Sequence, residues 1–373
     1  MPVRAQARIN LAAIERNVAR LMREVGRSTA VCPVVKADAY GHGIVPCAQA
    51  SLAGGARWLA VATAEECRVL GDAGVLTPGT RLLCLGALSP EELDVALRAG
   101  AEVVAWREEF VAAVGGLGGG RVHVKLDTGM GRLGTRDPGE ATRVAELAAR
   151  TEGVELAGAM THFATADERG DRFFDEQLDR FRAWAGPLRR EHPDLVLHAA
   201  NSAGMLRDRA CHFDLVRPGI AVYGMDPFHE DPDARGLEPA LELSSYVAEV
   251  KPCAAGETAG YGRRFTASEP TAIATVPIGY GDGVRRGLTN NADVLIDGRR
   301  YPVAGTVSMD NLTLDLLEPG SGVQRGAEVV LIGARGAERI LAEEIAQRLG
   351  TINYEVTCSV SGRVPRVHHR DGR

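Results

Sequence analysis

The chain has 373 residues, of which 45% are apolar and 25% are charged, and its formal net charge is −6. This composition is typical of a globular protein, and the length suggests two domains or a large α/β barrel with an added module. A negative charge without any basic block argues against a nucleic-acid partner. The sequence also lacks the run of about 20 apolar residues that a membrane span needs, and it shows no apolar signal-peptide core.

Up to about residue 235, short apolar runs alternate with segments of helical period. Eight runs have the length of buried strands, and they cover residues 31–36, 58–62, 81–85, 101–105, 121–126, 154–161, 195–198 and 213–217. Eight β–α repeats with short connections predict a closed (β/α)8, TIM-like barrel over residues 1–235. A doubly wound open sheet is the alternative, but eight units in about 200 residues favour closure.

Two helices of this region carry clear signals. One is predicted ahead of the first run, with Asn10 as its N-cap and an apolar face made of Leu11, Ile14, Val18, Leu21 and Val25. A second is predicted after residue 89, because Ser89-Pro90-Glu91-Glu92 is a capping box with proline at the first helical position.

From about residue 236 the pattern changes. Residues 231–236 resemble a linker, with Pro232 between two aspartates and Gly236 at the end. Strands are then predicted at 243–250, 271–278, 293–296, 301–307, 312–316 and 328–332, with a hairpin turn at Asp297-Gly298. One helix is predicted over about 337–349, ending at Gly350. Residues 236–373 are therefore expected to form a mostly-β domain.

Lysine is scarce in this sequence. Of 43 basic residues, 40 are arginines and only three are lysines, namely Lys36, Lys125 and Lys251. Codon bias explains most of this scarcity. Arginine cannot replace lysine where an amine must lose its proton, so the surviving lysines are the first candidates for chemistry. Lys251, on a predicted β-domain strand, is expected to be solvated.

The spacing of the cysteines and histidines argues against a disulfide framework and against a metal site. Seven cysteines are present without a C-x-x-C pair, so we expect reduced thiols in a cytoplasmic protein rather than a disulfide framework. The nine histidines show no metal-ligand spacing, and no metal is expected.

Reactive groups of such barrels lie where the strands end. The predicted strand ends carry Lys36, Lys125, His162, Asn201-Ser202 and Arg217 followed by Gly219-Ile220. Each has an ordinary structural explanation, such as a solvated lysine at a strand end or a helix cap at Asn201. Together they indicate a site for a phosphorylated ligand that reacts with an amine. An amine at the end of an apolar strand is partly desolvated, which favours its neutral, nucleophilic form.

The segment from Val34 to Gly43 resembles the pyridoxal-phosphate attachment motif of the alanine racemases, which are fold type III enzymes. Further matching segments follow in order at residues 124–134, 161–164, 198–202, 216–224, 260–262, 276–283, 308–310 and 352–355. Two positions depart from the family pattern: Ser308 stands where many relatives carry cysteine, and Asn311 where glutamine is frequent. The resemblance covers nearly the whole chain.

The resemblance implies two residues that exchange a proton. Lys36 would hold pyridoxal 5′-phosphate as a Schiff base and act as one acid/base. Tyr261 would be the second base, supplied by the partner subunit on the opposite face of the substrate. An ordinary phenol is protonated at neutral pH, so Tyr261 needs help, which His162 is expected to give by hydrogen bonding.

It also implies the groups that hold the cofactor and the substrate. Arg217 would face the pyridine nitrogen and, because a guanidinium only donates, would disfavour protonation of the ring. The phosphate would be bound by Tyr40, Ser202, Gly219, Ile220 and Tyr354, and His162 and Asn201 would be further cofactor-binding residues. Arg132 would hold the substrate carboxylate, the backbone at Met309 would help, and Tyr280, Arg286, Ile352 and Tyr354 would line a narrow entrance.

In relatives the lysine that matches Lys125 is often carbamylated, and we expect the same modification here. A salt bridge from Lys125 to Asp127 is the alternative. The predicted function is racemisation of L- and D-alanine for cell-wall peptidoglycan by a homodimer with shared active sites. A racemase of broader specificity is an open alternative. A decarboxylase would carry an acidic residue in place of Arg217, and a non-enzymatic carrier would lack the β domain.

Overall fold

The computed structural model describes residues 3–372. The chain forms two compact units. The barrel unit contains Ile14–Ala39 and Ile44–Phe228, and the β-rich unit contains residues 3–13, Tyr40–Gly43 and residues 229–372. The short segment Tyr40–Gly43 thus belongs to a different unit from the residues on either side of it.

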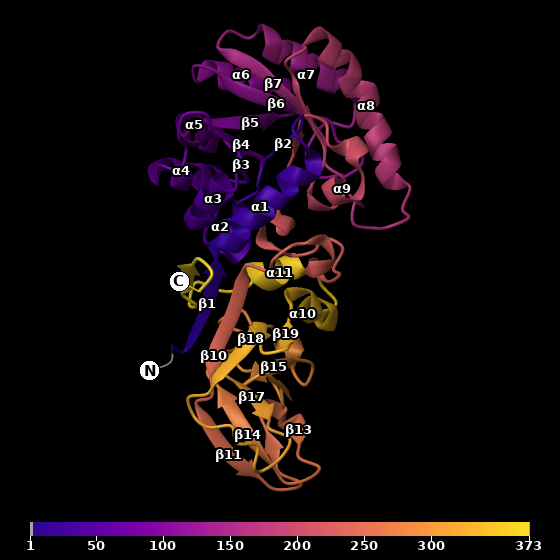
Figure 1. The fold of residues 1–373 in the computed structure, drawn as a ribbon. Coiled ribbons are helices and arrows are strands. Elements are labelled where there is room, and N and C mark those ends of the chain that lie inside the picture. The colour runs from indigo at the N-terminus through magenta and orange to yellow at the C-terminus, as the bar shows by residue number, and fades with distance from the viewer. Residues whose placement is uncertain (1–2, 373) are drawn as a thin grey trace. The chain divides into compact units, whose positions relative to one another are not determined.

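Eight parallel strands form the barrel unit, with helices around them (Figure 1). They are β2 (Ala30–Val31), β3 (Trp58–Val61), β4 (Arg81–Cys84), β5 (Ala101–Ala105), β6 (Gly120–Lys125), β7 (Val154–Met160), β8 (Val196–His198) and β9 (Leu215–Val216). Strands β3 to β8 make one continuous sheet, and β2 pairs with β9. A bridge between Val34 and Ala60 joins the end of β2 to β3, and the amide of Asp214 donates to the carbonyl of Leu197 at 3.0 Å beside β9 and β8. Each of the eight predicted runs overlaps one strand, although β2 shares only Val31 with the run 31–36 and therefore ends before Lys36. The predicted barrel architecture is confirmed.

The helices between these strands follow their local signals. They are α1 (Leu11–Val25), α3 (Ile44–Ala53), α4 (Ala64–Asp72), α5 (Pro90–Arg98), α6 (Glu108–Gly116), α7 (Pro138–Arg150), α8 (Phe173–Glu191) and α9 (Ser202–Arg207). The side chain of Asn10 accepts from the amide of Ala12 at 3.1 Å, at the start of α1. The capping box of α5 is present in both directions between Ser89 and Glu92. Both predicted helix starts are therefore confirmed.

The β-rich unit is built on two sheets. The larger contains β16 (Arg299–Pro302), β15 (Asp293–Ile296), β18 (Glu328–Arg335), β10 (Leu241–Tyr246), β1 (Ala5–Asn10) and β20 (Arg366–His369) in that order, with β19 (Glu338–Ile340) beside β18. The smaller contains β11 (Glu249–Cys253), β14 (Thr271–Val276) and β17 (Leu312–Asp315). Asp297 and Gly298 both have positive φ, at 51° and 77°, and form the predicted tight turn between β15 and β16.

Three local predictions are corrected in this unit. The predicted strand 243–250 is interrupted, because the amide of Val247 bonds to Ala327 and that of Ala248 bonds to Thr275, where the chain passes to the other sheet. The predicted strand 301–307 ends at Pro302. The predicted helix 337–349 begins only at Ala342. Residues 338–340 form β19 instead, because the chain reverses at Gly336, whose φ is 63°.

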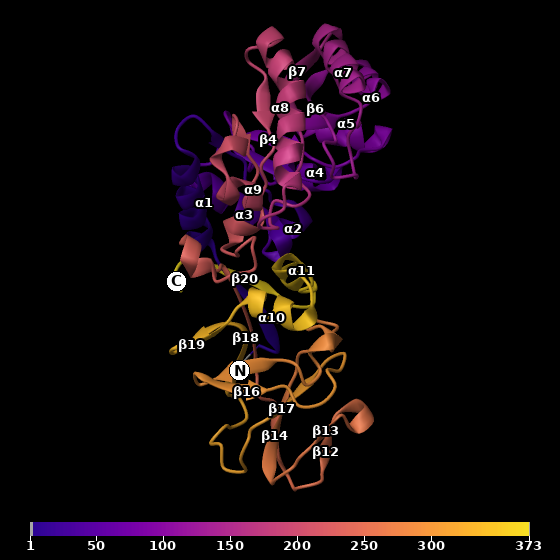
Figure 2. The same cartoon turned by 90° about the vertical axis from the view of Figure 1, so that its right-hand side faces the viewer.

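Two further elements complete this unit. Helix α10 (Ala342–Leu349) ends at Gly350 in the left-handed conformation, as predicted, and α11 (Asn353–Cys358) follows it. Residues 231–236 are not a plain linker, since Pro232–Arg235 is a 3₁₀ turn capped by Asp231. The hairpin of β12 (Thr258–Ala259) and β13 (Phe265–Thr266) lies at the end of this unit opposite α10 and α11 (Figures 1 and 2).

Two properties of the described residues bear on the sequence-based expectations. Among residues 3–372, we find no helix that combines the length and the apolarity needed to cross a lipid bilayer. All seven cysteines are free thiols, and only Cys358 is exposed.

Candidate active site

Lys36 stands at the start of an unusual turn. The next four residues, Ala37 to Tyr40, all have φ between 52° and 55°, so α2 (Lys36–Gly41) is left-handed. Left-handed helical geometry costs roughly 1–2 kcal/mol per L-residue, and strain of this kind is concentrated at functional sites. The preceding strand end is held in place, because the hydroxyl of Tyr223 donates to the carbonyl of Val34 at 2.9 Å. The backbone therefore presents Lys36 in a conformation that local propensity does not favour.

Strand β6 ends at Lys125, which is 4% exposed. Burial, together with the positive charges of Arg217 and Arg132, lowers the pKa of Lys125 to about 8. The carboxylate of Asp127 accepts from the amides of Gly129 and Gly131, and its charge raises the pKa of Lys125 by less than burial and the two arginines lower it. A large fraction of the Lys125 amine is therefore neutral near pH 8.

The loop after Lys125 folds back onto its own strand. The amide of Asp127 donates to the carbonyl of Thr135 at 2.8 Å. A Cβ on Gly134 would lie 2.9 Å from the amide nitrogen of Asp127 and 3.1 Å from the carbonyl oxygen of Lys125, so the approach requires glycine. Arg132 is exposed within this closed loop and borders a cavity of about 800 Å³ that Trp106 and Phe110 also line.

His162 marks the centre of the candidate site. Its pKa lies well below the usual value, first because of burial and then because of the charges of four cations: Arg217, Lys125, Arg132 and Lys36. Lys125 ends β6, Arg132 lies in the loop after β6, Arg217 follows β9, and Lys36 begins α2. The structure therefore gathers the residues that the sequence places at separate strand ends, and it keeps His162 neutral at neutral pH.

Arg217 is buried, with 2% of its surface exposed. Its guanidinium donates to the carbonyls of Thr161 and Ala199 at 2.8 and 3.0 Å, and to Nδ1 of His198 at 2.7 Å and of His162 at 3.3 Å. Burial lowers the pKa of Arg217 to about 10. The group consequently remains charged near neutral pH and has a fixed orientation.

Gln177 of α8 is a residue that the sequence analysis missed. Its amide nitrogen donates to Oγ1 of Thr128 and to the carbonyl of His162, both at 3.1 Å. Its amide oxygen accepts from the amide of Ala164 at 2.8 Å. Gln177 is fully buried and holds the loops after β6 and β7 together. A glutamine on the buried face of a predicted helix was the available signal.

The residues expected at the phosphate lie together after β8 and β9. The hydroxyl of Ser202 accepts from the amide of Gly219 at 2.9 Å, and Ile220 begins a buried 3₁₀ turn. The side chain of Asn201 accepts from the amide of Gly204 at 2.9 Å and caps α9. Asn201 thus has the capping role that its position after a strand also suggested.

The remaining predicted residues lie in the β-rich unit. Tyr40 is buried, and its ring lies 5.9 Å from that of Tyr354 on α11. Tyr261 is 74% exposed in a 3₁₀ turn between β12 and β13. Met309 is 52% exposed, and its carbonyl accepts from the amide of Gly281 at 2.9 Å. The expected entrance residues Tyr280, Arg286 and Ile352 are also exposed.

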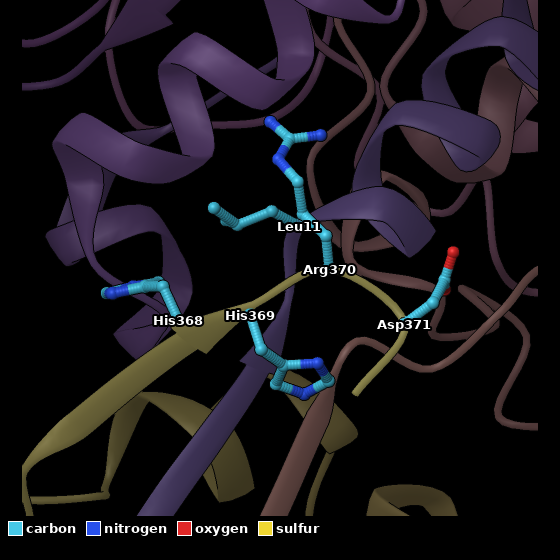
Figure 3. Close-up of a pocket in the computed structure, with 5 residues that line it drawn as sticks. All are labelled: Leu11, His368, His369, Arg370 and Asp371. Atoms are coloured by element: carbon cyan, nitrogen blue, oxygen red, sulfur yellow. The ribbon is translucent and has the colours of Figure 1, made fainter. Parts of the chain in front are cut away.

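A separate cavity of about 800 Å³ is lined by Leu11 and residues 368–371 (Figure 3). Its rim is held together by two hydrogen bonds of 3.1 Å between Asn10 and Asp371. None of the predicted site residues lines it. Among the residues that the structure describes, no group of three or more histidine, cysteine or acidic side chains could hold a metal ion.

Comparison with known proteins decides the family. The family model described as the N-terminal domain of alanine racemase matches residues 9–227, and that of the C-terminal domain matches residues 240–368. The chain belongs to the alanine racemase family. The enzymes of this family are isomerases, so the predicted family and enzyme class are confirmed.

Relatives match this alanine racemase family member along almost its whole length. An alanine racemase of Symbiobacterium thermophilum is 40% identical over 368 residues, covering 97% of this chain and 96% of that protein. The solved alanine racemase of Streptomyces coelicolor superposes with a TM-score of 0.92 at 37% identity, over 98% of this chain and 97% of that one. The alanine racemase of Bacillus anthracis, solved with bound L-Ala-P, has a TM-score of 0.89 at 36% identity, covering 99% and 96% of the two chains.

Proposed function

We propose that this chain interconverts L-alanine and D-alanine with pyridoxal 5′-phosphate as cofactor and with Lys36 and Tyr261 as the proton-exchanging residues. The observation that carries the proposal is that Arg217 donates to His162 at 3.3 Å, while the charges of Lys36, Lys125, Arg132 and Arg217 all act on that ring. The relative solved with L-Ala-P supports alanine as the substrate.

The donors of the site suit the acceptors of this cofactor. Phosphate oxygens accept hydrogen bonds, and the hydroxyls of Ser202 and Tyr40 can donate them. The amide of Gly219 donates to Ser202 and would reach the phosphate only by sharing that proton. Burial raises the pKa of Tyr40, which keeps this phenol protonated as a donor. The amide of Ile220 and the hydroxyl of Tyr354 complete the proposed phosphate set, while Asn201 shapes it by capping α9.

When bound through Lys36, the cofactor supplies the electron-withdrawing ring that makes the Cα proton of an amino acid removable. The Lys36 amine takes or returns that proton on one face, and Tyr261 of the partner subunit does so on the other. Nδ1 of neutral His162 accepts from Arg217, so its Nε2–H can donate to the phenolate oxygen of Tyr261, which assists Tyr261 as a base. Arg132 holds the substrate carboxylate through its planar fork, with backbone support at Met309.

Arg217 has a second effect on the outcome. Its guanidinium stays charged at neutral pH, so it donates to the pyridine nitrogen without giving up its proton. The ring nitrogen then stays unprotonated, which limits spreading of charge into the ring and suits plain proton exchange at Cα. A decarboxylase of the same fold type would be expected to carry an acidic residue here.

We propose that the active enzyme is a homodimer with shared sites. Tyr261 is 74% exposed, and its turn lies at the end of the β-rich unit opposite the helix that carries Tyr354 (Figure 2). A cofactor phosphate beside Tyr354 would therefore be reached by Tyr261 of another subunit. In this division of labour, residues 1–235 hold the cofactor with the help of Tyr354, and residues 236–373 give the second base to the partner.

The decisive experiment follows the Cα proton. L-alanine is incubated with the cofactor-loaded enzyme in D₂O, and both Cα deuterium and D-alanine are measured. Deuterium incorporation with formation of D-alanine is expected. A protein that binds the cofactor but exchanges no Cα proton would contradict the proposed function.

The shared site has its own test. Lys36→Ala and Tyr261→Phe homodimers should each be inactive. Mixed dimers of the two variants contain one site with both native residues, so partial activity should return. Verified mixed dimers that stay inactive would place Tyr261 in the site of its own subunit.

The biological role is also a proposal. We infer that the product D-alanine supplies cell-wall peptidoglycan and that the enzyme works in the cytoplasm, where its free thiols would stay reduced. Expression in a bacterium that requires external D-alanine should restore growth without it. Failure of an expressed, active enzyme to restore growth would contradict this role.

A further inference from the structure

Four polar side chains lie inside the barrel, where apolar layers are usual. They are Glu102 on β5, His123 on β6, His198 on β8 and Arg217 after β9, and none is more than 3% exposed. Glu102 stands near the start of its strand, and His198 is the last residue of its own. The four side chains therefore run along the barrel from the N-terminal strand ends to the candidate active site.

The four groups are joined by consecutive hydrogen bonds. Nη1 of Arg217 lies 2.7 Å from Nδ1 of His198, and Nε2 of His198 lies 2.8 Å from Nδ1 of His123. Nε2 of His123 lies 2.7 Å from Oε2 of Glu102. Since a guanidinium only donates and a carboxylate only accepts, both ends set the direction. Each imidazole must carry its proton on Nε2 and accept on Nδ1.

The backbone around His123 is adapted to this side chain. A Cβ on Gly158 of β7 would lie 2.1 Å from Nδ1 of His123, so only glycine leaves room for the ring. The pairing of β6 with β7 shifts register between Val122 and His123, and such irregularities re-aim side chains. The position of His123 is therefore built into two adjacent strands.

Two arginines contact Glu102, at the end of the hydrogen-bond series that is farthest from Arg217. Arg81 donates from Nη2 to Oε2 of Glu102 at 2.7 Å and from Nε to Oε1. Arg121 lies 3.4 Å from the same carboxylate. The guanidinium of Arg81 also stacks on the ring of Trp58, 3.8 Å from its centroid. Glu102 thus accepts hydrogen bonds on two sides, which fixes its carboxylate.

We propose that Glu102, His123 and His198 act as a positioning relay for Arg217. The proposal rests on the proposed function, in which Arg217 faces the pyridine nitrogen of the cofactor. The relay selects the tautomer of His198 that presents a lone pair to Arg217. The opposite tautomer would set an N–H against the guanidinium and displace it from the cofactor.

A carboxylate at position 102 sets this selection from the far end of the relay. The partners of Arg217 are uncharged carbonyls and imidazoles, so at the near end only the guanidinium itself, which can only donate, favours the same tautomer of His198. Glutamine at position 102 has one oxygen, but Arg81 and His123 both require an acceptor. If the amide nitrogen faced His123, every proton in the relay would reverse.

The protonation states of His123 and His198 agree with this direction of hydrogen-bond donation. Burial lowers the pKa of His123 and outweighs the hydrogen bond to Glu102, which raises it. Burial and the charge of Arg217 lower the pKa of His198 well below its usual value. Both rings are thus neutral near pH 7, as a directed chain of single protons requires.

Three variants separate the relay from general stability. Glu102→Gln keeps the shape and removes the charge. His198→Asn keeps an acceptor where Nδ1 stood but is too short to reach His123. Glu155→Gln is the matched control, because Glu155 pairs with Arg121 at 2.6 Å on the neighbouring strand but is exposed and outside the relay.

The first measurement uses the protein without cofactor. Imidazole ¹⁵N NMR on histidine-labelled protein should show both His123 and His198 as neutral Nε2–H tautomers. Glu102→Gln should give His198 mixed tautomers, and Glu155→Gln should leave the native pattern. A native His198 that carries its proton on Nδ1 would overturn the proposal, whatever the activity of the enzyme.

The second measurement uses the cofactor-loaded enzyme. Glu102→Gln and His198→Asn should lower kcat roughly 10-fold, the smallest effect typical of lost outer partners of a functional histidine. KM should change less than about 2-fold, and the absorbance band of the bound cofactor should shift. Glu155→Gln should change none of these. Native kcat and absorbance in a folded Glu102→Gln enzyme would overturn the relay.

Failures of the two proposals are distinguishable. An absence of deuterium exchange would reject the racemase function but would leave the tautomers of the cofactor-free protein as predicted. If Glu102→Gln does not fold, His198→Asn tests the same link from the other end. Glu102→Asp should have a higher kcat than Glu102→Gln if its carboxylate still reaches His123. A Glu102→Asp enzyme that has the native tautomers but no higher kcat would contradict the relay.

Discussion

The rings of Tyr40 and Tyr354 pack against each other, with centroids 5.9 Å apart and planes tilted by 47°. The two residues are far apart in the sequence, and the left-handed turn after Lys36 brings Tyr40 to this position. Both phenols are proposed donors to the cofactor phosphate. A tyrosine-to-phenylalanine substitution removes one hydroxyl but keeps the contact between the rings, so it tests the hydroxyl alone.

Tyr354→Phe should weaken cofactor binding about 10-fold, because a hydrogen bond to a charged group contributes about 1.5–3 kcal/mol. Tyr40→Phe should act similarly, and the double variant should show non-additivity because the rings touch. Cofactor affinity is measured by absorbance titration of the cofactor-free protein. Tyr301→Phe, at a buried tyrosine of β16, is the control. Unchanged affinity in both single variants would remove the tyrosines from the phosphate site.

Lys125 should carry a carbamate formed from carbon dioxide. Only the neutral amine reacts, and burial lowers the pKa of Lys125 to about 8, so the modified fraction should increase as the pH rises through 8. In ¹³C-bicarbonate, the enzyme should give a carbamate NMR signal that Lys125→Arg abolishes. Lys251→Arg, at an exposed lysine of β11, should keep it. A native spectrum without this signal would contradict the modification.

Ala37→Gly should stabilise the fold while harming catalysis. Ala37 has a φ of 52°, where an L-residue costs about 1–2 kcal/mol, although added freedom in the unfolded chain offsets part of the gain. The free energy of unfolding should rise by about 0.5–1 kcal/mol. At the same time kcat should fall, because the turn that orients Lys36 becomes flexible.

The control for this prediction is Ala112→Gly, in the interior of α6 at an exposed position. There the same substitution should cost about 1 kcal/mol. Urea unfolding and steady-state kinetics measure both variants. A destabilised Ala37→Gly protein would show that the left-handed turn carries no strain.

Glu102 should make stability depend on pH in the acid range. Burial alone would raise its pKa, but the hydrogen bonds from His123 and Arg81 and the charge of Arg81 outweigh burial and hold the pKa at about 2. A depressed pKa contributes stability above the unfolded value of about 4.3. That contribution, about 3 kcal/mol, is lost as the pH falls towards 2.

The measurement compares urea midpoints of the native and Glu102→Gln proteins between pH 5 and pH 2. The native protein should lose its advantage as the pH falls. Glu155→Gln should follow the native curve, because its carboxylate is exposed. Parallel curves for the native and Glu102→Gln proteins would contradict the assignment of this carboxylate.

The sequence predicted the barrel well because each signal that it used lies within a few consecutive residues. The eight apolar runs, the capping box at Ser89 and the Asp297-Gly298 turn depend on neighbouring residues. Strand β1 escaped the prediction although its burial alternates along Ala5–Asn10, because alanines give a weak alternating signal. Its partners β10 and β20 are more than 200 residues away. The helix predicted over 337–349 failed because periodicity does not register the reversal at Gly336.

The candidate site was also predictable only in part from the sequence. Motifs identified Lys36, Arg217 and His162, and the structure brings their charges together. Glu102 and His123 were visible as polar residues inside apolar runs, but nothing in the sequence said that they face each other. That contact depends on the register of β6 against β7 and on the space beside Gly158.

By itself, the sequence determined the eight β–α units, the β-rich second part and the kinds of side chain at the strand ends. These follow from periodicity, capping and backbone preference, which act over a few residues. Only the tertiary structure decided the left-handed turn after Lys36, the links made by Gln177 and the chain of hydrogen bonds from Arg217 to Glu102. Each of these depends on barrel closure, because hydrogen-bond partners distant in sequence are chosen by strand register.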